Sequence, residues 1–212
     1  MIDALEALIR LREGNRRFAS DDRTGRAQRE TRPADLVGGQ EPFAIILGCS
    51  DSRVPAEIVF DQGLGDLFVI RVAGNVVAPS QIGSVEFAAT KFGTRLVVVM
   101  GHSDCGAIHA TVEELRAPTE LRSRNLRSIV DFVRPSVQTL IDEGLGSNLE
   151  TLVAEAVRTN VRASAEHLRH GSDIIEELER DEGLVIVGAE YSLETGLVDY
   201  FDGVPEGASI EG

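Results

Sequence analysis

The sequence predicts an α/β fold in which a mostly parallel central β-sheet is flanked by helices and preceded by an N-terminal helical arm. Four short apolar runs rich in β-branched residues lack polar alternation, which is typical of strands buried on both faces. Segments with helical spacing of apolar residues separate these runs. Strands that alternate with helices imply right-handed crossovers, so helices are expected to cover both faces of the sheet.

The elements follow in chain order. An amphipathic helix is expected over residues 2–19 and a polar, irregular segment over residues 20–40. The runs predicted as strands are FAIILG, LFVIRV, RLVVVMG and GLVIVGAE, residues 43–48, 67–72, 95–101 and 183–190. The segments predicted as helices are residues 80–92, 105–115, 121–143 and 148–170. Ser147 and Glu150 form a capping-box pattern before the last helix, and residues 194–203 are expected to add a short edge strand.

The length of 212 residues predicts one domain, with residues 1–40 as helix and arm and residues 41–212 as the α/β core. The net charge of -14 argues against nucleic acid or an anionic membrane as a partner. The N-terminus has acidic residues and no unbroken apolar signal region, and no apolar run is long enough to span a membrane. Two cysteines do not make a disulfide scaffold, so we expect a cytoplasmic protein.

Residues capable of metal chemistry follow two of the predicted strands. Ligands of open α/β sheets bind outside the carboxyl ends of the strands. The first strand is followed by Cys49, Asp51 and Arg53, and the third by His102 and Cys105. If these strands are neighbours, the two thiolates and the imidazole can reach one point, and such a donor set suits Zn²⁺. Three protein ligands would leave one tetrahedral position open, as at catalytic zinc sites.

These residues also have simpler interpretations. A lone cysteine is usually a small buried hydrophobe, and a Cys49–Cys105 disulfide is geometrically conceivable but disfavoured in a cytosolic chain. Asp51 either completes the metal site or lies beside it. A phosphatase-type loop between Cys49 and Arg53 would need more backbone amides than CSDSR supplies. The remaining histidines, interpreted as structural or surface residues without partners of ligand type, are His109, His167 and His170.

The motifs CSDSR (49–53), RVAGN (71–75) and HSDCG (102–106) resemble those of the β-class carbonic anhydrases. The resemblance extends over nearly the whole chain through LREGNRRF, GQEPFAIILGCSDSRV, GSVEFA and VGAEYSLETG, residues 11–18, 39–54, 83–88 and 187–196. It implies that Cys49, His102 and Cys105 bind one Zn²⁺ per chain. It also implies an open state, in which Arg53 holds Asp51 and water completes the site, and a closed state, in which Asp51 itself binds the metal.

The resemblance further suggests a substrate pocket. Gln40 stands where plant-like members present a glutamine amide to the substrate. Phe68, Val72 and Phe87 would form an apolar slot for CO2, and the amides of Gln40 and Gly106 would donate to a bicarbonate oxygen. Phe87 replaces a tyrosine of many members, so a hydroxyl contact is expected to be missing.

Two further positions depart from family patterns. VAGN (72–75) replaces the commoner NVAN, so the adjoining pocket wall is expected to differ. Ile46 stands where bicarbonate-regulated members carry a tryptophan, which argues against that regulatory site.

The implied function is the reversible hydration of CO2 to bicarbonate and a proton, with a zinc-bound hydroxide oriented by Asp51. Two thiolates donate more charge than three imidazoles, so activity is expected to rise at alkaline pH. The alternatives are hydrolysis of carbonyl sulfide or carbon disulfide at the same site, a non-catalytic bicarbonate sensor or scaffold, and a purely structural zinc module. The family forms homodimers, often paired into tetramers. The N-terminal helix and arm would suit wrapping around a neighbour, with Gln40 and Phe87 serving the partner's site.

Overall fold

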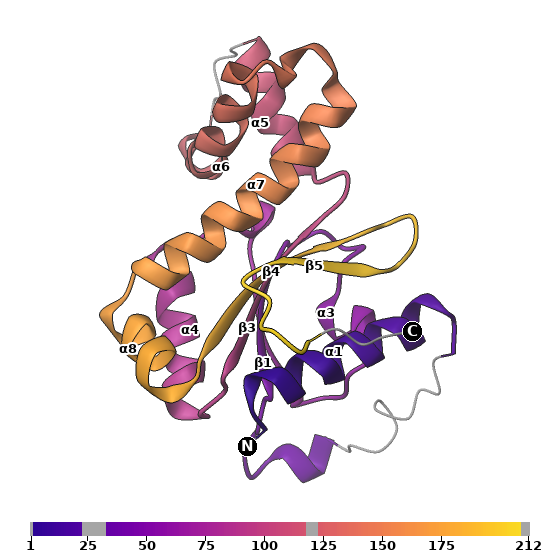
Figure 1. Cartoon of the computed structure of the whole chain (residues 1–212), viewed down its shortest axis with the longest axis vertical. Helices are drawn as coiled ribbons and strands as arrows, with labels where there is room; N and C mark the ends of the chain where they lie inside the picture. The colour runs from indigo at the N-terminus through magenta and orange to yellow at the C-terminus, as the bar shows by residue number, and fades with distance from the viewer. Residues whose placement is uncertain (1, 23–32, 118–122, 209–212) are drawn as a thin grey trace.

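The computed structural model describes residues 2–22, 33–117 and 123–208. In these residues, five strands form one sheet in the order β2-β1-β3-β4-β5 (Figure 1). The strands are β1 (Ala44–Gly48), β2 (Leu67–Arg71), β3 (Leu96–His102), β4 (Val185–Tyr191) and β5 (Val198–Asp202). The first four strands are parallel and β5 runs antiparallel to β4. The predicted fold class and all five predicted strands are therefore confirmed.

The central strands explain why the apolar runs lack alternation. Every residue of β1 and of β3 is buried, because helices cover both faces of the sheet. On one face, α1 (Ala4–Ala19) and the short α3 (Ala56–Val59) pack against alternate residues of β1 and β3. On the other face lie α4 (Pro79–Lys91), α7 (Leu149–His170) and α8 (Asp173–Glu182).

A third apolar cluster lies beyond the carboxyl edge of the sheet. It is built by α5 (Gly106–Arg116), α6 (Arg124–Asp142) and the first half of α7, which project away from the sheet at the top of Figure 1. Short 3₁₀ helices, η1 (Pro33–Leu36), η2 (Ala73–Asn75) and η3 (Leu145–Ser147), join the main elements. Cys49 and Cys105 belong to this third cluster, so the predicted metal ligands lie where the sheet meets the helical extension.

The N-terminal helix packs on its own chain, whereas the sequence suggested that it would suit a neighbour. Leu8 and Leu11 are fully buried, and the helix approaches so closely at Gly14 that an added Cβ would lie 1.8 Å from the Phe60 carbonyl oxygen. Asn15 donates to Val59 O and Gly196 O and accepts from Val198 N, at 3.1, 2.8 and 2.8 Å. The apolar side of α1 is thus used within the chain. Of the expected arm, residues 23–32 lie outside the described residues.

Two local predictions at helix ends are corrected. The cap of α7 is Asn148, whose side chain accepts from Thr151 N at 3.1 Å, and Ser147 instead ends η3. Asn and Ser are comparable N-cap residues, so the pattern did not fix which of two neighbours caps the helix. Helix α8 was not predicted, although Ser172 caps it by accepting from Ile175 N.

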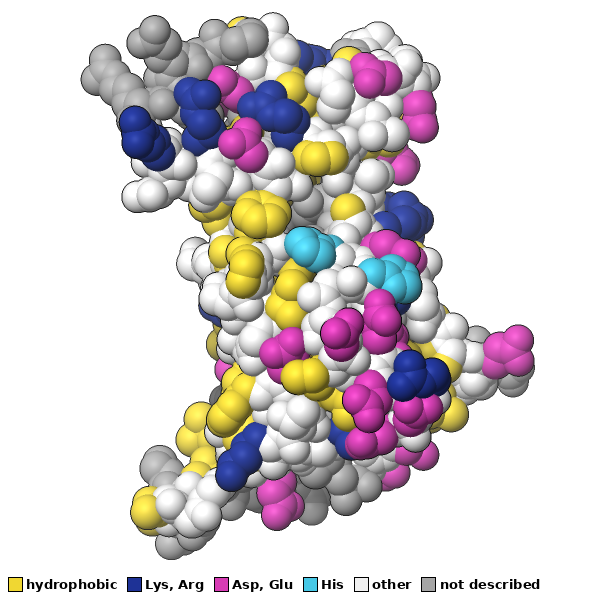
Figure 2. Space-filling model, turned by 90° about the vertical axis from the view of Figure 1, so that its left-hand side faces the viewer, with side chains coloured by type: hydrophobic (Ala, Val, Ile, Leu, Met, Phe, Trp, Pro, Cys, Tyr) yellow, Lys and Arg dark blue, Asp and Glu magenta, His cyan; other side chains and the backbone are white. Residues whose placement is uncertain are grey.

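The surface charge is unevenly distributed. Acidic side chains gather over α8, whereas acidic and basic side chains are mixed over the helical extension at the top of Figure 2. No helix in the described part of the chain has both the length and the apolarity needed to cross a bilayer.

Candidate metal centre

The predicted ligands converge at the carboxyl edge of the sheet. Because β1 lies directly between β2 and β3, Gly48 pairs with both Arg71 and Met100, and the segments after all three strands lie side by side. Cys49 follows β1, while His102 ends β3 and Cys105 caps α5. Their ligand atoms all lie within 4.8 Å of one another, and all three residues are buried.

His102 is prepared as a ligand by its hydrogen bonding. Its Nδ1 atom lies 2.9 Å from Ser103 O, and a carbonyl oxygen only accepts, so we assign the ring proton to Nδ1. The lone pair is then on Nε2, which is buried and has no hydrogen-bond partner among the described residues. Buried polar atoms are normally satisfied, so the unpartnered nitrogen beside two thiols fits a metal ligand.

The two thiols influence each other's ionisation. The hydrogen bond with Cys105 lowers the pKa of Cys49, although burial acts in the opposite direction. The same contact, together with burial, raises the pKa of Cys105. The amide of Gly74 also donates to Cys49 Sγ at 3.4 Å. The cluster therefore favours one thiolate even without a cation, and a soft divalent ion would supply the charge needed to ionise the second thiol.

Asp51 and Arg53 form a two-pronged ion pair beside this cluster. Arg53 Nε donates to Asp51 Oδ1 at 3.0 Å, Arg53 Nη2 donates to Asp51 Oδ2 at 2.8 Å, and the Arg53 amide donates to Oδ1 at 2.9 Å. These bonds lower the pKa of the Asp51 carboxyl. Asp51 Oδ2 lies 3.9 Å from His102 Nε2, so the carboxylate borders the cluster while Arg53 holds it.

Arg53 is also tied to a pair that the sequence interpretation missed. Its Nη2 donates to Asp104 O at 3.3 Å, and its Nη1 lies 3.5 Å from Asp104 Oδ2. The other carboxylate oxygen of Asp104 lies 2.9 Å from His109 Nε2. The interpretation of His109 as lacking a partner of ligand type is therefore wrong. It is also wrong for His170, whose Nε2 lies 3.1 Å from a carboxylate oxygen of Glu166. Asp104 stands between two ligands in HSDCG, and this position was the available signal.

Arg71 fixes the backbone of the segment that follows β1. Arg71 Nε donates to Cys49 O at 2.9 Å, and its Nη2 donates to Asp51 O. Val72 follows directly and packs against the cluster that contains both cysteines. Gly106 is the exposed first residue of α5. Of the predicted pocket residues, Val72 and Gly106 thus lie beside the three predicted metal ligands of the same chain.

The other predicted pocket residues lie near the opposite edge of the sheet. Gln40 precedes β1 and lines a cavity of about 450 Å³ with Lys91 and Phe92. The five residues of β1 span about 16 Å between this edge and Cys49. Phe68 packs against Phe87 and Phe92, with ring centroids 6.2 and 6.1 Å away, and Phe87 is 52% exposed. The structure therefore does not bring Gln40, Phe68 and Phe87 to their own chain's cluster.

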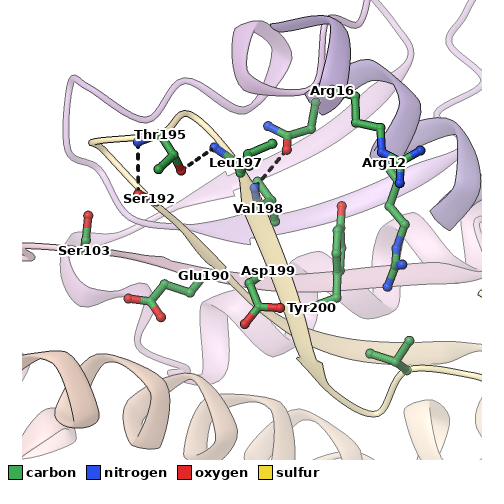
Figure 3. A pocket seen from close by; sticks show the side chains of 12 residues that line it. Arg12, Arg16, Ser103, Glu190, Ser192, Thr195, Leu197, Val198, Asp199 and Tyr200 are labelled. Carbon is green, nitrogen blue, oxygen red and sulfur yellow. Dashed lines mark hydrogen bonds between the residues drawn. The ribbon is translucent and has the colours of Figure 1, made fainter. Parts of the chain in front are cut away.

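A separate cavity of about 760 Å³ lies between α1 and the β4–β5 hairpin (Figure 3). Arg12 and Arg16 line one side, and Glu190 and Asp199 line the other. Its lining includes none of the predicted site residues. Because groups of both charges face the same hollow, the lining does not favour a ligand of one charge.

Comparisons with known proteins agree with the fold and the cluster. A family model described as carbonic anhydrase matches residues 44–198. The chain is 40% identical over 186 residues to carbonic anhydrase 2 of Mycobacterium tuberculosis, covering 88% of this chain and 87% of the relative. It is 39% identical over 196 residues to the carbonic anhydrase of Mycolicibacterium smegmatis, covering 89% of each. A solved Coccomyxa β-carbonic anhydrase in complex with acetazolamide is 25% identical, with a TM-score of 0.72 over 89% of this chain and 83% of that one.

The fold and these matches define an enzyme class, the carbonic anhydrases, whose general reaction is the hydration of CO2. Within that class, the chain belongs to the β-carbonic anhydrase family.

Proposed function

We propose that the chain catalyses the reversible hydration of CO2 with one Zn²⁺ held by Cys49, His102 and Cys105. The observation that carries the proposal is the buried convergence of these three ligand atoms within 4.8 Å. A Zn²⁺ ion bound there would lower the pKa of a water molecule from about 15.7 towards about 7, which makes hydroxide available near neutral pH. Two thiolates and one imidazole are a donor set that Zn²⁺ prefers.

Asp51 and Arg53 have different roles, since Asp51 orients the attacking group and Arg53 holds Asp51 in place. The Asp51 carboxylate accepts a hydrogen bond from the attacking hydroxyl group. This bond orients the lone pair of the hydroxyl oxygen towards the carbon of CO2. Its lowered pKa keeps it ionised throughout the neutral and alkaline range. Arg53 donates to both carboxylate oxygens of Asp51, which would keep this carboxylate from binding the metal itself.

Val72 and Gly106 form the near side of the substrate pocket. Val72 gives CO2 an apolar contact beside the two cysteines. The Gly106 amide, at the first position of the 11-residue helix α5, donates to the developing bicarbonate oxygen. To its own site, the chain contributes only this side of the pocket.

A homodimer, or a tetramer of paired dimers, would complete the pocket. Gln40, Phe68 and Phe87 lie near the far edge of the sheet, and the half-exposed Phe87 ring belongs to an aromatic group with Phe68 and Phe92. We propose that a second chain covers this group and receives Gln40, Phe68 and Phe87 into its own site. The two free cysteines suit the reducing cytoplasm, where we place the protein.

Stopped-flow CO2 hydration by the zinc-loaded protein, measured between about pH 7 and pH 9, tests the proposal. Fast turnover that increases with pH is the expected result. Absence of turnover in a protein shown to contain zinc would contradict CO2 hydration. Turnover of carbonyl sulfide or carbon disulfide in the same preparation would then favour the alternative reaction.

A further inference from the structure

The apolar face of α7 contains two buried polar residues. Asn160 is 2% exposed and Ser164 is 6% exposed, and they lie one helical turn apart among buried aliphatic residues. A buried amide or hydroxyl is costly unless it is hydrogen-bonded. Their hydrogen bonds both go to one short segment, the 3₁₀ turn η2 that follows β2.

This turn connects α7 with a predicted metal ligand. Asn160 Nδ2 donates to Gly74 O at 2.8 Å, and Ser164 Oγ donates to Asn75 O at 3.1 Å. On its other side, the amide of Gly74 donates to Cys49 Sγ at 3.4 Å. All three hydrogen bonds are buried. Gly74 is therefore hydrogen-bonded to α7 through its carbonyl and to the sulfur of Cys49 through its amide.

Gly74 needs an external anchor because its own conformation is permissive. Its φ of 68° lies in the left-handed region, and an added Cβ would lie 3.0 Å from the Cβ of Ala107, so the site favours glycine. Glycine has more backbone freedom than any other residue, and its amide direction is accordingly easy to change. The hydrogen bond from Asn160 restricts that freedom, because it fixes the peptide plane on the carboxyl side of Gly74.

We propose that Asn160 is a positioning residue of the metal centre, which acts by aiming the Gly74 amide at the Cys49 sulfur. This inference rests on the proposed metal site and adds a residue outside its motifs. An N–H group that donates to a thiolate stabilises negative charge on sulfur. Asn160 thereby sets how much charge Cys49 donates to a bound metal and how tightly the metal is held.

The test is the variant Asn160→Leu, which keeps the number and branching of the side-chain heavy atoms and removes the donor. The wild-type and variant proteins are loaded with Co²⁺ in place of Zn²⁺, and the sulfur-to-cobalt charge-transfer band is recorded. We expect the band to move to longer wavelength, because a thiolate that has lost a hydrogen bond gives up its electrons more readily. We also expect the zinc affinity, measured by chelator competition, to fall about tenfold, because the contact that holds Cys49 in position as a ligand is weakened.

The matched control is Ser164→Ala. It removes a buried hydrogen bond from the same helix to the same turn without touching Gly74, so the band and the zinc affinity should remain at wild-type values. A folded Asn160→Leu protein with an unchanged band and affinity would overturn the proposal. So would an equal shift in Ser164→Ala, because the effect would then be a general loss of packing.

A second variant covers the case in which Asn160→Leu does not fold. Gly74→Ala keeps Asn160 and displaces the amide itself, and it should give the same shift to longer wavelength. An unchanged band in this variant would also overturn the proposal. Failure of the wild-type protein to bind Co²⁺ or Zn²⁺ would instead contradict the proposed metal function.

Discussion

The site residues at the carboxyl ends of the parallel strands are surrounded by their own chain, whereas those near the amino ends are not. At the carboxyl edge, the three predicted ligands are buried and the groups beside them are hydrogen-bonded within the chain. At the amino edge, Gln40 and the Phe87 ring are exposed. The chemistry of the proposed reaction is thus assembled within one chain, whereas much of the predicted substrate pocket requires another copy. Variants at each edge should therefore fail in different ways.

The largest effect is expected at the carboxyl edge, from Cys105→Ser. Exchange of a thiolate for a hydroxyl removes a soft, charged ligand, so zinc affinity should fall more than about a hundredfold and CO2 hydration should be lost. The measurement is zinc content after dialysis against a chelator. The control Ile108→Val changes another buried residue near the start of the same helix and should retain zinc. Full zinc occupancy in Cys105→Ser would exclude Cys105 as a ligand.

The second effect is expected from Asp51→Ala, which should keep zinc but lower kcat for CO2 hydration about a hundredfold. The reason is loss of the group that orients the hydroxyl. Because the pKa of Asp51 is lowered, Asp51 remains ionised at neutral and alkaline pH, so the loss should be similar across that range. Asp202→Ala is the control and should leave kcat unchanged. Asp202 is ion-paired with Arg169 at 2.7 Å and is buried to a similar degree as Asp51. An unchanged rate in Asp51→Ala would remove Asp51 from the mechanism.

The ligand positions could be predicted from sequence because they follow from topology. Chemically capable residues came directly after buried apolar runs, and parallel strands place such residues on one edge. The remaining condition was that the first and third strands be neighbours, and β1 does pair with β3. The pairing of Asp51 with Arg53 followed from the resemblance of CSDSR to a known motif.

Other features depend on contacts between distant segments and left little trace in the sequence. Asn160 lies 86 residues from the Gly74 carbonyl that it binds, and its only signal is a polar residue within an apolar helical stripe. Gln40 lies near the amino end of β1, whereas Cys49 follows its carboxyl end. The family motif alone did not show that Gln40 is therefore far from the metal ligands of its own chain. Helix α8 was missed because it is mostly charged, and only a few apolar side chains, among them Ile175 and Leu178, contact the core.

The proposed sharing of Gln40 between chains can be tested by complementation. Gln40→Ala and Asp51→Ala are each expected to be impaired. In a mixed dimer, one site lacks both groups, whereas the other has its own Asp51 and receives Gln40 from the partner. Random pairing should therefore restore about a quarter of the sites to full activity. The measurement is CO2 hydration before and after the two proteins are unfolded and refolded together.

Each variant refolded alone serves as the control for this experiment. A mixture no more active than the mean of the separate variants would show that Gln40 does not serve a partner's site. Light scattering of the wild-type protein is a simpler companion measurement, because a monomer would contradict the shared pocket altogether.

The smallest effect is expected from Asp104→Asn, which weakens the outer hold on Arg53. The Asp104 side chain is 66% exposed and its carboxylate lies 3.5 Å from Arg53 Nη1, so water and salt screen the pair and its contribution is small. Arg53 should then release Asp51 slightly more often, and Asp51 in turn should compete with water for the metal. We expect kcat to fall about two- to fivefold at low salt, and the difference from wild type to shrink as salt screens the pair. Asp131→Asn is the matched control, because Asp131 is 55% exposed and pairs with Arg134 at 3.4 Å outside the cluster. Equal losses in the two variants would mean that Asp104 acts only through surface charge, whereas a loss confined to Asp104→Asn would extend the control of Asp51 beyond Arg53.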